Sequence, residues 1–275
     1  MRLAVEAPAK VNLHLEILGR RADGFHELET VFQTIDLCDT VAVSLEPGVG
    51  LALDGDDPSL PWDASNLAWR AAAAYIAVNP LPGRVTMQVA KRIPAGGGLG
   101  GGSADAAAVL NACDRLAARP LGPAALEAIS ASLGSDIPFL IRGGTAHATG
   151  RGEVLSALPD LPALPLTVLM PEGAHCATPA VYRALTEAER GPRPARGAAW
   201  FAERLPGRLG EILANRLTPP ACRVCPAVGD LLAHLAGLGV PHLMTGSGAA
   251  CLAFAAVGPP PGVRAWPTRL RPALT

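Results

Sequence analysis

Lysine is almost missing from this sequence of 275 residues. Lys10 and Lys91 are the only two lysines, and every other basic residue is an arginine. A bias of this kind is typical of genomic composition. Because arginine is a poor substitute where a compact ammonium is needed, each remaining lysine becomes a candidate functional residue.

Net charge is also close to zero. The formal charge at pH 7 is −1 and the isoelectric point is about 6.6. Proteins that bind nucleic acids carry a basic patch or stripe, and no such stripe occurs here, so we expect no nucleic-acid partner. A phosphorylated ligand would be held by local groups and not by the field of the whole protein.

Long hydrophobic runs are absent as well. The charge-free residues 235–263 are broken by glycine, proline and polar residues, and they do not predict a membrane span. The first ten residues, MRLAVEAPAK, are too short and too charged to predict a signal peptide. We therefore expect a cytoplasmic protein without a membrane partner.

Cysteines are few, and the six that occur are scattered. In a chain of this length they do not predict a disulfide framework. Cys222 and Cys225 form a lone CxxC pair, but His234 and His242 do not follow it at zinc-finger spacing. Buried thiols are the favoured interpretation. A non-catalytic metal module at this pair is an alternative that stoichiometric zinc would support.

Glycine, in contrast, is concentrated in one stretch. Six glycines occur in residues 96–102, interrupted only by Leu99. Residues 84–90 before them alternate like a strand, and residues 103–116 after them predict a helix. Ser103 is expected to be the N-cap, with Asp105 in the first turn. Backbone N–H groups of such a loop, beside the positive end of a helix, predict a phosphate-binding site.

The glycine loop has three other interpretations. It is not a P-loop, because Gly102 stands where that motif needs a lysine. Gly96, Gly98 and Gly101 form a literal GxGxxG, so a nicotinamide-dependent oxidoreductase is an alternative that predicts NADH binding. Asp114 has nearly the spacing of the ribose-binding acid but lies inside the helical pattern. A flexible linker would seldom be flanked so closely by a strand and a helix.

The rest of the first half reads as strands followed by helices. Alternation predicts strands over 3–6, 11–18, 29–36 and 39–45. Pro8-Ala-Lys10 is expected to place Lys10 at a strand start. Ser65 should cap a helix over 66–78, and a helix over 124–133 should end at Gly134. Asp136 then stands at a predicted helix-to-strand junction.

The second half is expected to form a separate domain. Three prolines in residues 155–165 suggest an interdomain linker, which divides the chain into 1–155 and 156–275. Later segments predict a strand over 166–170 and helices from 180 onward, over 200–216 and over 227–237. A loop rich in proline, arginine and glycine is expected over 191–197, and a strand–turn–strand unit over 242–254. Residues 258–275 are expected to form a partly disordered tail.

Three separated motifs resemble those of the GHMP kinases. They are Pro8-Ala-Lys-Val-Asn-Leu13, Pro94-Ala-Gly-Gly-Gly-Leu-Gly-Gly-Gly-Ser-Ala104 and Thr245-Gly-Ser-Gly-Ala249. Arg21-Ala-Asp-Gly-Phe-His-Glu-Leu28 and Leu133-Gly-Ser-Asp-Ile-Pro-Phe139 are similar to the branch of this family that acts on a cytidine diphosphate-linked methylerythritol. The resemblance is dense over residues 8–153 and thinner beyond.

The resemblance implies an α+β fold of two domains with the active site in the cleft between them. It implies ATP-dependent phosphorylation of the 2-hydroxyl of the methylerythritol moiety, in the non-mevalonate route to isoprenoid precursors. Asp136 and Lys10 match the catalytic residues. The ATP site would comprise Asn66 and the glycine-loop residues Pro94, Ala95, Gly96, Gly97, Gly98, Leu99, Gly100, Gly101, Gly102, Ser103 and Ala104.

Five further residues match positions that bind the acceptor in the family: Asn12, Phe25, His26, Thr178 and Tyr182. His26 would stack on the cytosine or hydrogen-bond with it, and Tyr182 would close over it. Phe25 stands where the family often has tyrosine, so a hydroxyl is lost there. The short chain after Phe254 suggests a trimmed second domain.

The implied chemistry agrees with the residue types. Phosphoryl transfer depends mainly on positioning and charge stabilisation. Asp136 can accept or orient the hydroxyl proton, and Lys10 can keep Asp136 ionised. Mg²⁺ would bridge the phosphates, with Ser103 as a candidate contact and no evident carboxylate ligand. Another GHMP kinase, acting on homoserine or a mevalonate-type acceptor, is the nearest alternative, but it would not be expected to carry Asp23-Gly-Phe-His26.

Overall fold

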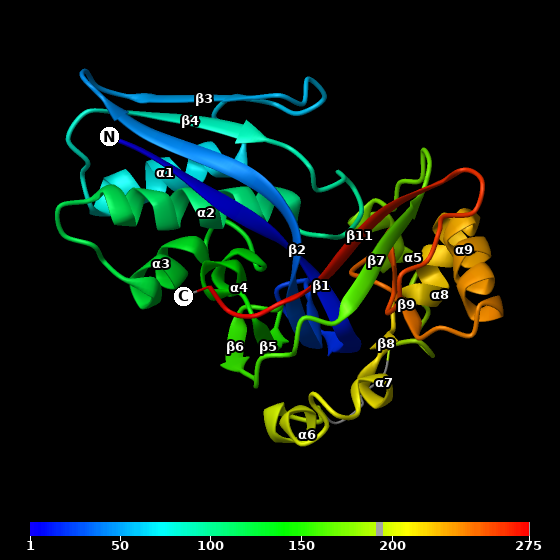
Figure 1. The fold of residues 1–275 in the computed structure, drawn as a ribbon. Coiled ribbons are helices and arrows are strands. Elements are labelled where there is room, and N and C mark those ends of the chain that lie inside the picture. The colour runs from blue at the N-terminus through cyan, green and yellow to red at the C-terminus, as the bar shows by residue number, and fades with distance from the viewer. Residues whose placement is uncertain (191–194, 275) are drawn as a thin grey trace.

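We describe residues 1–190 and 195–274 of a computed structural model (Figure 1). The loop expected over 191–197 therefore lies partly outside the described residues. Eleven strands among them form one sheet, in the order β3-β4-β2-β11-β7-β10-β9 with β1, β5, β6 and β8 attached at its sides. The strands are β1 Arg2–Arg20, β2 His26–Glu46, β3 Leu51–Gly55, β4 Arg84–Ala90, β5 Thr145–Gly150, β6 Val154–Ala157, β7 Pro165–Pro171, β8 Ala214–Asn215, β9 His242–Met244, β10 Cys251–Ala253 and β11 Val263–Arg271.

Helices cover one face of each part of the sheet (Figure 1). In the first half α1 and α2 lie side by side, and α2 packs on β1 and β2. In the second half α5 packs on α8, and α9 packs on β7, β9 and β10. The helices are α1 Leu67–Val78, α2 Gly101–Leu116, α3 Pro123–Ser130, α4 Ile137–Arg142, α5 Thr178–Ala184, α6 Ala198–Ala202, α7 Leu209–Ile212, α8 Thr218–Val224 and α9 Pro226–Gly237.

The first two strands are longer than the alternation pattern predicts. The expected strands 3–6 and 11–18 are one strand, β1, and 29–36 and 39–45 are one strand, β2. The two pair antiparallel, with register shifts between Pro8 and Lys10 and between Asn12 and His14. Lys10 is therefore in mid-strand, not at a strand start. Such irregularities re-aim side chains, and here they lie beside candidate site residues.

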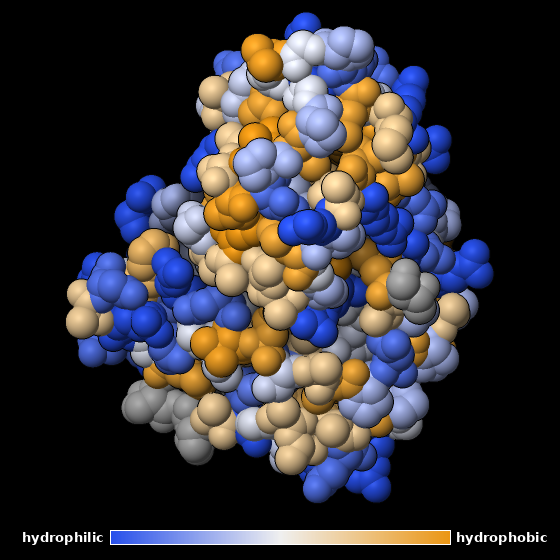
Figure 2. Space-filling model, turned by 90° about the vertical axis from the view of Figure 1, so that its left-hand side faces the viewer, coloured by the Kyte–Doolittle hydropathy of each residue, from blue (hydrophilic) through white to orange (hydrophobic). Residues whose placement is uncertain are grey.

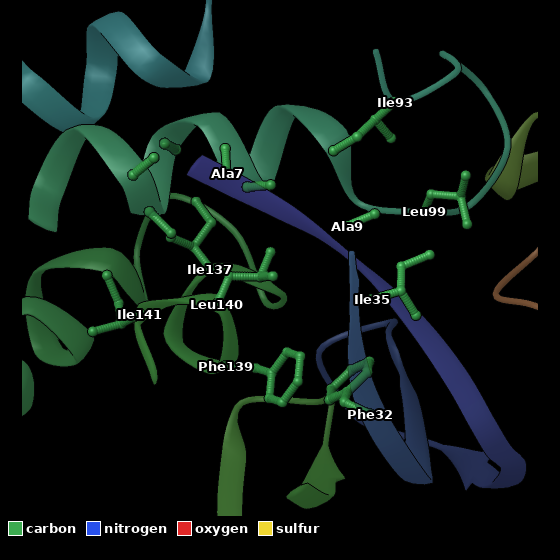
Figure 3. Close-up of a cluster of buried hydrophobic side chains, with 14 of the residues drawn as sticks. Ala7, Ala9, Phe32, Ile35, Ile93, Leu99, Ile137, Phe139, Leu140 and Ile141 are labelled. Atoms are coloured by element: carbon green, nitrogen blue, oxygen red, sulfur yellow. The ribbon is translucent and has the colours of Figure 1, made fainter. Parts of the chain in front are cut away.

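The main core fills the space between β1, β2, α2 and α4 (Figure 3). Phe32 of β2 stacks on Phe139 of α4 with ring centroids 5.1 Å apart. Ile93, before the glycine stretch, and Leu99, within it, are buried in the same cluster. The glycine loop is thus anchored in the core at its approach and at its middle.

Two segments fold differently from the sequence prediction. Residues 137–142 form helix α4 and not a strand, because Pro138 is well suited to the first turn of a helix. The tail expected to be partly disordered contains β11, which pairs antiparallel with β7 from Val263↔Pro171 to Arg269↔Pro165 and continues to β2 through Leu270↔Ile35.

Several helix ends also shift. Asn66, and not Ser65, caps α1 through a bond from the Ala68 N–H to its side chain. Helix α3 ends at Ser130, before the predicted Gly134. The segment 200–216, expected to be helical, contains the end of α6, the short helix α7 and strand β8. The helix over 227–237 and the strand–turn–strand unit are confirmed.

The proline-rich segment after β6 does not separate two independent sheets. Leu158 and Leu161 are buried in the main core, and β11 pairs with strands from both halves. A second apolar cluster consists mostly of residues from the second half, although Leu15 and Ile17 of β1 belong to it. The division at residue 155 stays a prediction.

The surface mixes hydrophobic and hydrophilic side chains. Figure 2 shows the side of the molecule that lies at the left in Figure 1, where groups of hydrophobic residues lie among hydrophilic ones. Among the described residues, no helix combines the length and the apolar character needed to cross a membrane.

One buried histidine, His14, is expected to make the stability of the fold depend on pH. His14 is 1% exposed, and its Nδ1 lies 2.7 Å from the Ile212 carbonyl oxygen. A carbonyl only accepts, so Nδ1 carries the proton, while the buried Nε2 has no partner. Burial lowers the pKa of His14, and the nearest charges act in both directions, from Glu16, Arg196 and Glu29.

We expect the free energy of unfolding to fall as the pH drops below about 6.5. The unfolded chain then binds a proton at its ordinary histidine pKa, which the folded chain binds only at lower pH. Each unit of depression contributes about 1.4 kcal/mol. Urea unfolding from pH 7.5 to 5 measures the slope, and His14→Gln should flatten it. Equal slopes in both proteins would contradict the assignment.

Candidate active site

The glycine loop joins β4 to α2 and is built from alternating left-handed residues. Gly96, Gly98 and Gly100 have φ values of +73°, +74° and +71°, a conformation that L side chains rarely adopt. Gly100 is the N-cap of α2, so the helix begins before Ser103, and the expected Ser103 cap is wrong. Ser103 lies in the first turn instead, and Asp105 lies beyond it.

The predicted ATP-binding residues of this loop stay together in the structure. The stretch from Pro94 to Ala104 runs continuously from the end of the approach segment into the first turns of α2. Several backbone N–H groups at the start of a 16-residue helix are free of intrahelical partners. The loop is therefore suited to bind an anion such as phosphate.

The loop is tightly packed against the turn between β9 and β10. A Cβ atom on Gly98 would lie 3.0 Å from the Thr245 carbonyl oxygen and 3.2 Å from that of Gly248. A Cβ atom on Gly246 would lie 2.9 Å from the Gly98 carbonyl oxygen. The second and third motifs thus touch through backbone atoms that leave no room for side chains.

Lys91 anchors the start of the loop in a buried cluster of charges. Its Nζ lies 2.5 Å from an Asp39 carboxylate oxygen and 2.6 Å from one of Asp105. The Arg92 and Ile93 N–H groups donate to the other Asp39 oxygen. Burial and the Asp39 charge raise the pKa of Asp105 to about 7, against the opposing effect of Lys91. That Asp39 would hold Lys91 and the start of the loop was not predicted from the sequence.

Lys10 lies on the other side of the loop. Its backbone N–H donates to the Leu99 carbonyl at 3.0 Å, and a Cβ atom on Gly100 would lie 3.0 Å from Lys10 Cγ. The Lys10 ammonium lies 3.3 Å from an Asp136 carboxylate oxygen and donates to Asn12 Oδ1 at 3.0 Å. Both lysines of the chain therefore contact the glycine loop.

Asp136 stands at the N-cap position of α4, where it is 31% exposed in its side chain. It faces a cavity of about 210 Å³ that it shares with Lys10 and Asn12. Gly98, Gly100, Gly246 and Ser247 also line this cavity. The cavity thus joins the predicted catalytic pair to the glycine loop.

A second, larger cavity of about 600 Å³ adjoins the first, and the two share Leu28, Arg151, Thr178 and Tyr182 as lining residues. All the predicted acceptor-binding residues except Asn12 line the larger one. The remaining lining residues include Arg20, Arg183 and Arg190. The larger cavity is therefore rich in arginine and aromatic side chains.

His26 and Tyr182 form the aromatic part of this larger cavity. Their ring centroids are 4.8 Å apart with planes tilted by 32°. Burial and the charges of Arg190 and Arg20 lower the pKa of His26, whose buried Nε2 has no partner. Burial and the Asp136 carboxylate raise the pKa of Tyr182 to about 12. Both rings are therefore neutral at pH 7.

Two further features of the larger cavity were only partly foreseen. Phe25 is 55% exposed, and the Arg151 guanidinium lies over its ring at 5.0 Å. The sequence signal for Arg151 is its position between two glycines, Gly150 and Gly152. In the structure both glycines have positive φ. Thr178 shares a 2.8 Å hydrogen bond with Ser247, which links α5 to the β9–β10 turn.

The side chain of Asn66, a predicted site residue, bonds to nearby backbone groups. Its Oδ1 accepts from the Ala68 N–H and its Nδ2 donates to the Pro61 carbonyl. The next residue, Leu67, lies 3.8 Å from the place of a Cβ atom on Gly102. Asn66 is thus near the loop, and a direct contact with ATP stays a prediction.

The structure gives little support to the two alternatives from the sequence, a nicotinamide site and a metal module. Asp114, the candidate ribose-binding acid, accepts from the Tyr75 hydroxyl and from the Leu121 and Gly122 N–H groups. Over residues 1–190 and 195–274, no group of three or more His, Cys, Asp or Glu side chains is arranged to hold a metal ion. The metal-module hypothesis therefore has no ligand set in the described chain.

Comparisons with known proteins agree with this geometry. A family model of the GHMP kinases N terminal domain matches residues 66–144. A 4-diphosphocytidyl-2-C-methyl-D-erythritol kinase from Heliobacterium modesticaldum is 40% identical over 270 residues, which cover 91% of this chain and 85% of the relative. One from Granulibacter bethesdensis is 40% identical over 260 residues, with coverage of 89% and 82%.

Solved structures show the same relationship. The crystal structure of a 4-(cytidine 5'-diphospho)-2C-methyl-D-erythritol kinase matches with a TM-score of 0.82 at 36% identity, over 98% of this chain and 99% of that one. A homoserine kinase from Cytophaga hutchinsonii shares the fold, with a TM-score of 0.70 at 17% identity, over 92% of this chain and 84% of that one.

The fold, the glycine loop and these matches define an ATP-dependent GHMP kinase that phosphorylates a small-molecule alcohol. Within that class, the chain belongs to the 4-diphosphocytidyl-2-C-methyl-D-erythritol kinase family. The predicted fold class and family are confirmed. The oxidoreductase interpretation of the literal GxGxxG is wrong, because the glycines belong to a kinase loop.

Proposed function

We propose that the protein transfers the γ-phosphate of ATP to the 2-hydroxyl of 4-diphosphocytidyl-2-C-methyl-D-erythritol, giving the 2-phosphate of the non-mevalonate isoprenoid route. One observation carries the proposal. The cavity of Lys10 and Asp136 opens beside the glycine loop on one side and into the arginine-rich aromatic cavity on the other. A long acceptor with a base at one end and a hydroxyl at the other fits this arrangement.

The glycine loop would hold the ATP phosphates. Its residues 96, 98 and 100 are left-handed, which turns successive N–H groups toward one side of the loop. The N-terminus of α2 adds a partial positive charge, which favours the anion. The net charge of the protein is nearly zero, so these local groups supply the attraction.

Mg²⁺ would arrive with ATP. Magnesium is bound through a few protein oxygens together with substrate phosphates. The Ser103 hydroxyl in the first turn of α2 is a candidate contact, and Asp136 is the one carboxylate among the described lining residues of the smaller cavity. When bound, Mg²⁺ neutralises charge on the transferring phosphoryl group.

Asp136 would accept the proton of the attacking hydroxyl. A hydroxyl is a weak nucleophile, and a positioned carboxylate removes or orients its proton as the bond to phosphorus forms. The Lys10 ammonium, 3.3 Å away, stabilises the carboxylate and is close enough to favour negative charge on the hydroxyl oxygen. Asn12 holds Lys10 in place through its Oδ1.

The larger cavity would bind the cytidine diphosphate. His26 and Tyr182 are already in contact, so the base would stack on this pair from outside or hydrogen-bond with the free Nε2 of His26. The surrounding guanidinium groups can neutralise the diphosphate, because arginine binds phosphate oxygens in a fork geometry. The groups available are those of Arg20, Arg151, Arg183 and Arg190.

The direct test is ATP consumption by the purified protein with this acceptor, beside homoserine and mevalonate at equal concentration. We expect turnover with the cytidyl acceptor alone. Turnover only with another alcohol would overturn the proposed acceptor while keeping the kinase. The expected location in the cytoplasm stays a prediction from the sequence.

Tyr182→Ala should raise KM for the cytidyl acceptor by about 2- to 12-fold, because an aromatic contact of this kind contributes about 0.5–1.5 kcal/mol beyond burial. KM for ATP should stay within about threefold, since Tyr182 does not touch the glycine loop. Steady-state kinetics with each substrate varied measures both. Tyr182→Phe keeps the ring and serves as the control. An unchanged acceptor KM in the alanine variant would remove Tyr182 from the binding site.

A further inference from the structure

The turn between β9 and β10, residues 245–248, forms one wall of the smaller cavity. Gly246 and Ser247 line it together with Lys10 and Asp136. The turn also bears on the glycine loop, where Gly98 is packed between two of its carbonyl groups. The Ala250 N–H donates to the Gly97 carbonyl at 3.3 Å. Displacement of this turn would therefore move the glycine loop.

Asn215 holds the turn from behind. Its Nδ2 donates to the Met244 carbonyl at 2.7 Å and to the Gly246 carbonyl at 2.8 Å. Carbonyl oxygens only accept, so the amide nitrogen must face them. The Oδ1 atom accepts from the Leu217 N–H at 2.9 Å. Asn215 itself does not line the cavity.

The segment that carries Asn215 is fixed to the strand of the catalytic lysine. Asn215 pairs in parallel with Leu15 of β1, and the Arg216 N–H donates to the Leu15 carbonyl at 2.8 Å. The Arg216 guanidinium binds both carboxylate oxygens of Glu16, at 3.0 and 3.2 Å. The backbone bonds thus hold Asn215 to β1, the strand that carries Lys10 and Asn12, and the ion pair adds stability to the same segment.

Strand β1 also contacts the turn directly. The Asn12 N–H donates to Thr245 Oγ1 at 2.8 Å. The turn is therefore held to one strand at two points, by Asn12 at its start and by Asn215 at Gly246. Two points of attachment fix an orientation, which a single contact does not.

We propose that Asn215 is a positioning residue for phosphoryl transfer. By bonding the Met244 and Gly246 carbonyls, it sets the turn, and through the turn the glycine loop, at a fixed place relative to Lys10 and Asp136. The inference rests on the proposed function and extends it to a residue outside the cavity. Loss of fixed geometry at a distance commonly reduces rate more than it reduces acceptor binding.

The test uses Asn215→Asp, which keeps the size of the side chain and the acceptor for the Leu217 N–H but removes both donors. At pH 8 we expect kcat to fall by about 10–100-fold, with KM for the acceptor within about threefold. At lower pH a protonated carboxyl can donate to one carbonyl again. The ratio of variant to parent kcat should therefore rise as the pH is lowered from 8 to 6.

Arg216→Met is the matched control. It breaks the ion pair with Glu16 that holds the same segment, but leaves both Asn215 donors in place. We expect a lower Tm and a kcat within about threefold of the parent. Parental kcat in Asn215→Asp would overturn the proposal, as would an equal loss of kcat in both variants without recovery at low pH.

A second readout separates this inference from the proposed acceptor. The affinity for a non-hydrolysable ATP analogue, measured by calorimetry without acceptor, reports on the glycine loop alone. We expect weaker binding in Asn215→Asp than in Arg216→Met. If the parent fails to phosphorylate the cytidyl acceptor, the proposed function falls, and equal analogue affinity in the two variants would then overturn the role of Asn215 separately.

Discussion

Asp136→Asn should lower kcat by about 10²–10⁴-fold, the range typical of a lost general base. Asparagine keeps the shape of the side chain and can still accept from the Lys10 ammonium, which lies 3.3 Å away. It cannot take the hydroxyl proton. Binding of ATP and of the acceptor should therefore change little, and steady-state kinetics beside calorimetry of both ligands measures the difference.

Asp160→Asn is the control for the same chemical change at a distant position. Asp160 is exposed and accepts from the Ala273 N–H, away from both cavities. It should leave kcat unchanged. If Asp136→Asn kept kcat within about threefold of the parent, the rate would not depend on proton transfer to this carboxylate, and Asp136 would have only a structural part at the start of α4.

Gly98→Ala should reduce kcat/KM for ATP by about 100-fold, because the added methyl group displaces the glycine loop or the turn, and a displacement of about 1 Å can have an effect of this size. The new methyl group would lie 3.0 and 3.2 Å from two backbone oxygens of the β9–β10 turn. Backbone atoms cannot rotate away, so the loop or the turn must move. The φ of +74° adds about 1–2 kcal/mol of strain for a residue with a Cβ atom.

Gly50→Ala separates the effect of backbone strain from the effect of the contact between Gly98 and the β9–β10 turn. Gly50 also has a positive φ, +105°, but nothing lies within 4 Å of its added Cβ atom, and it stands in the turn before β3. This variant should lose stability in thermal unfolding while it keeps kcat/KM for ATP. Equal kinetic losses in the two variants would mean that backbone strain, and not the contact with the turn, causes the effect at Gly98.

The unit around the glycine loop was predictable because its signals are local. Alternation in β4, the glycines and the apolar spacing of α2 each act over a few residues. The error at the N-cap has a physical reason. Serine is the better capping side chain, but the loop reaches the helix with φ at +71°, which selects Gly100.

The errors in other elements came from interactions that local patterns do not contain. The tail is rich in proline and glycine, yet β11 is ordered by pairing with β7, about 100 residues earlier in the chain. Strand formation depends on such neighbours more than on composition. In α4 the proline was informative, since Pro138 lies in the first helical turn, where proline is favoured.

Candidate site residues could be named where they lie inside the resembling motifs, as Lys10, Asp136 and His26 do. The structure brings them to the two adjoining cavities, and their roles stay predictions. Asp39 and Asn215 were not predicted as site residues. Asp39 acts on Lys91, which lies 52 residues away, and Asn215 acts on a turn 29 residues or more away. A short polar residue in a strand or at its end has many ordinary uses, so only the three-dimensional contacts reveal these two.

The position of β11 has a consequence for synthesis of the protein on the ribosome. It is translated after every other described strand, yet it lies between β2 and β7 and supplies a partner for each residue of β7. Until it emerges, β7 has an open edge that can pair with another chain. Nascent chains stalled before residue 263 should therefore aggregate more readily than those released after residue 271.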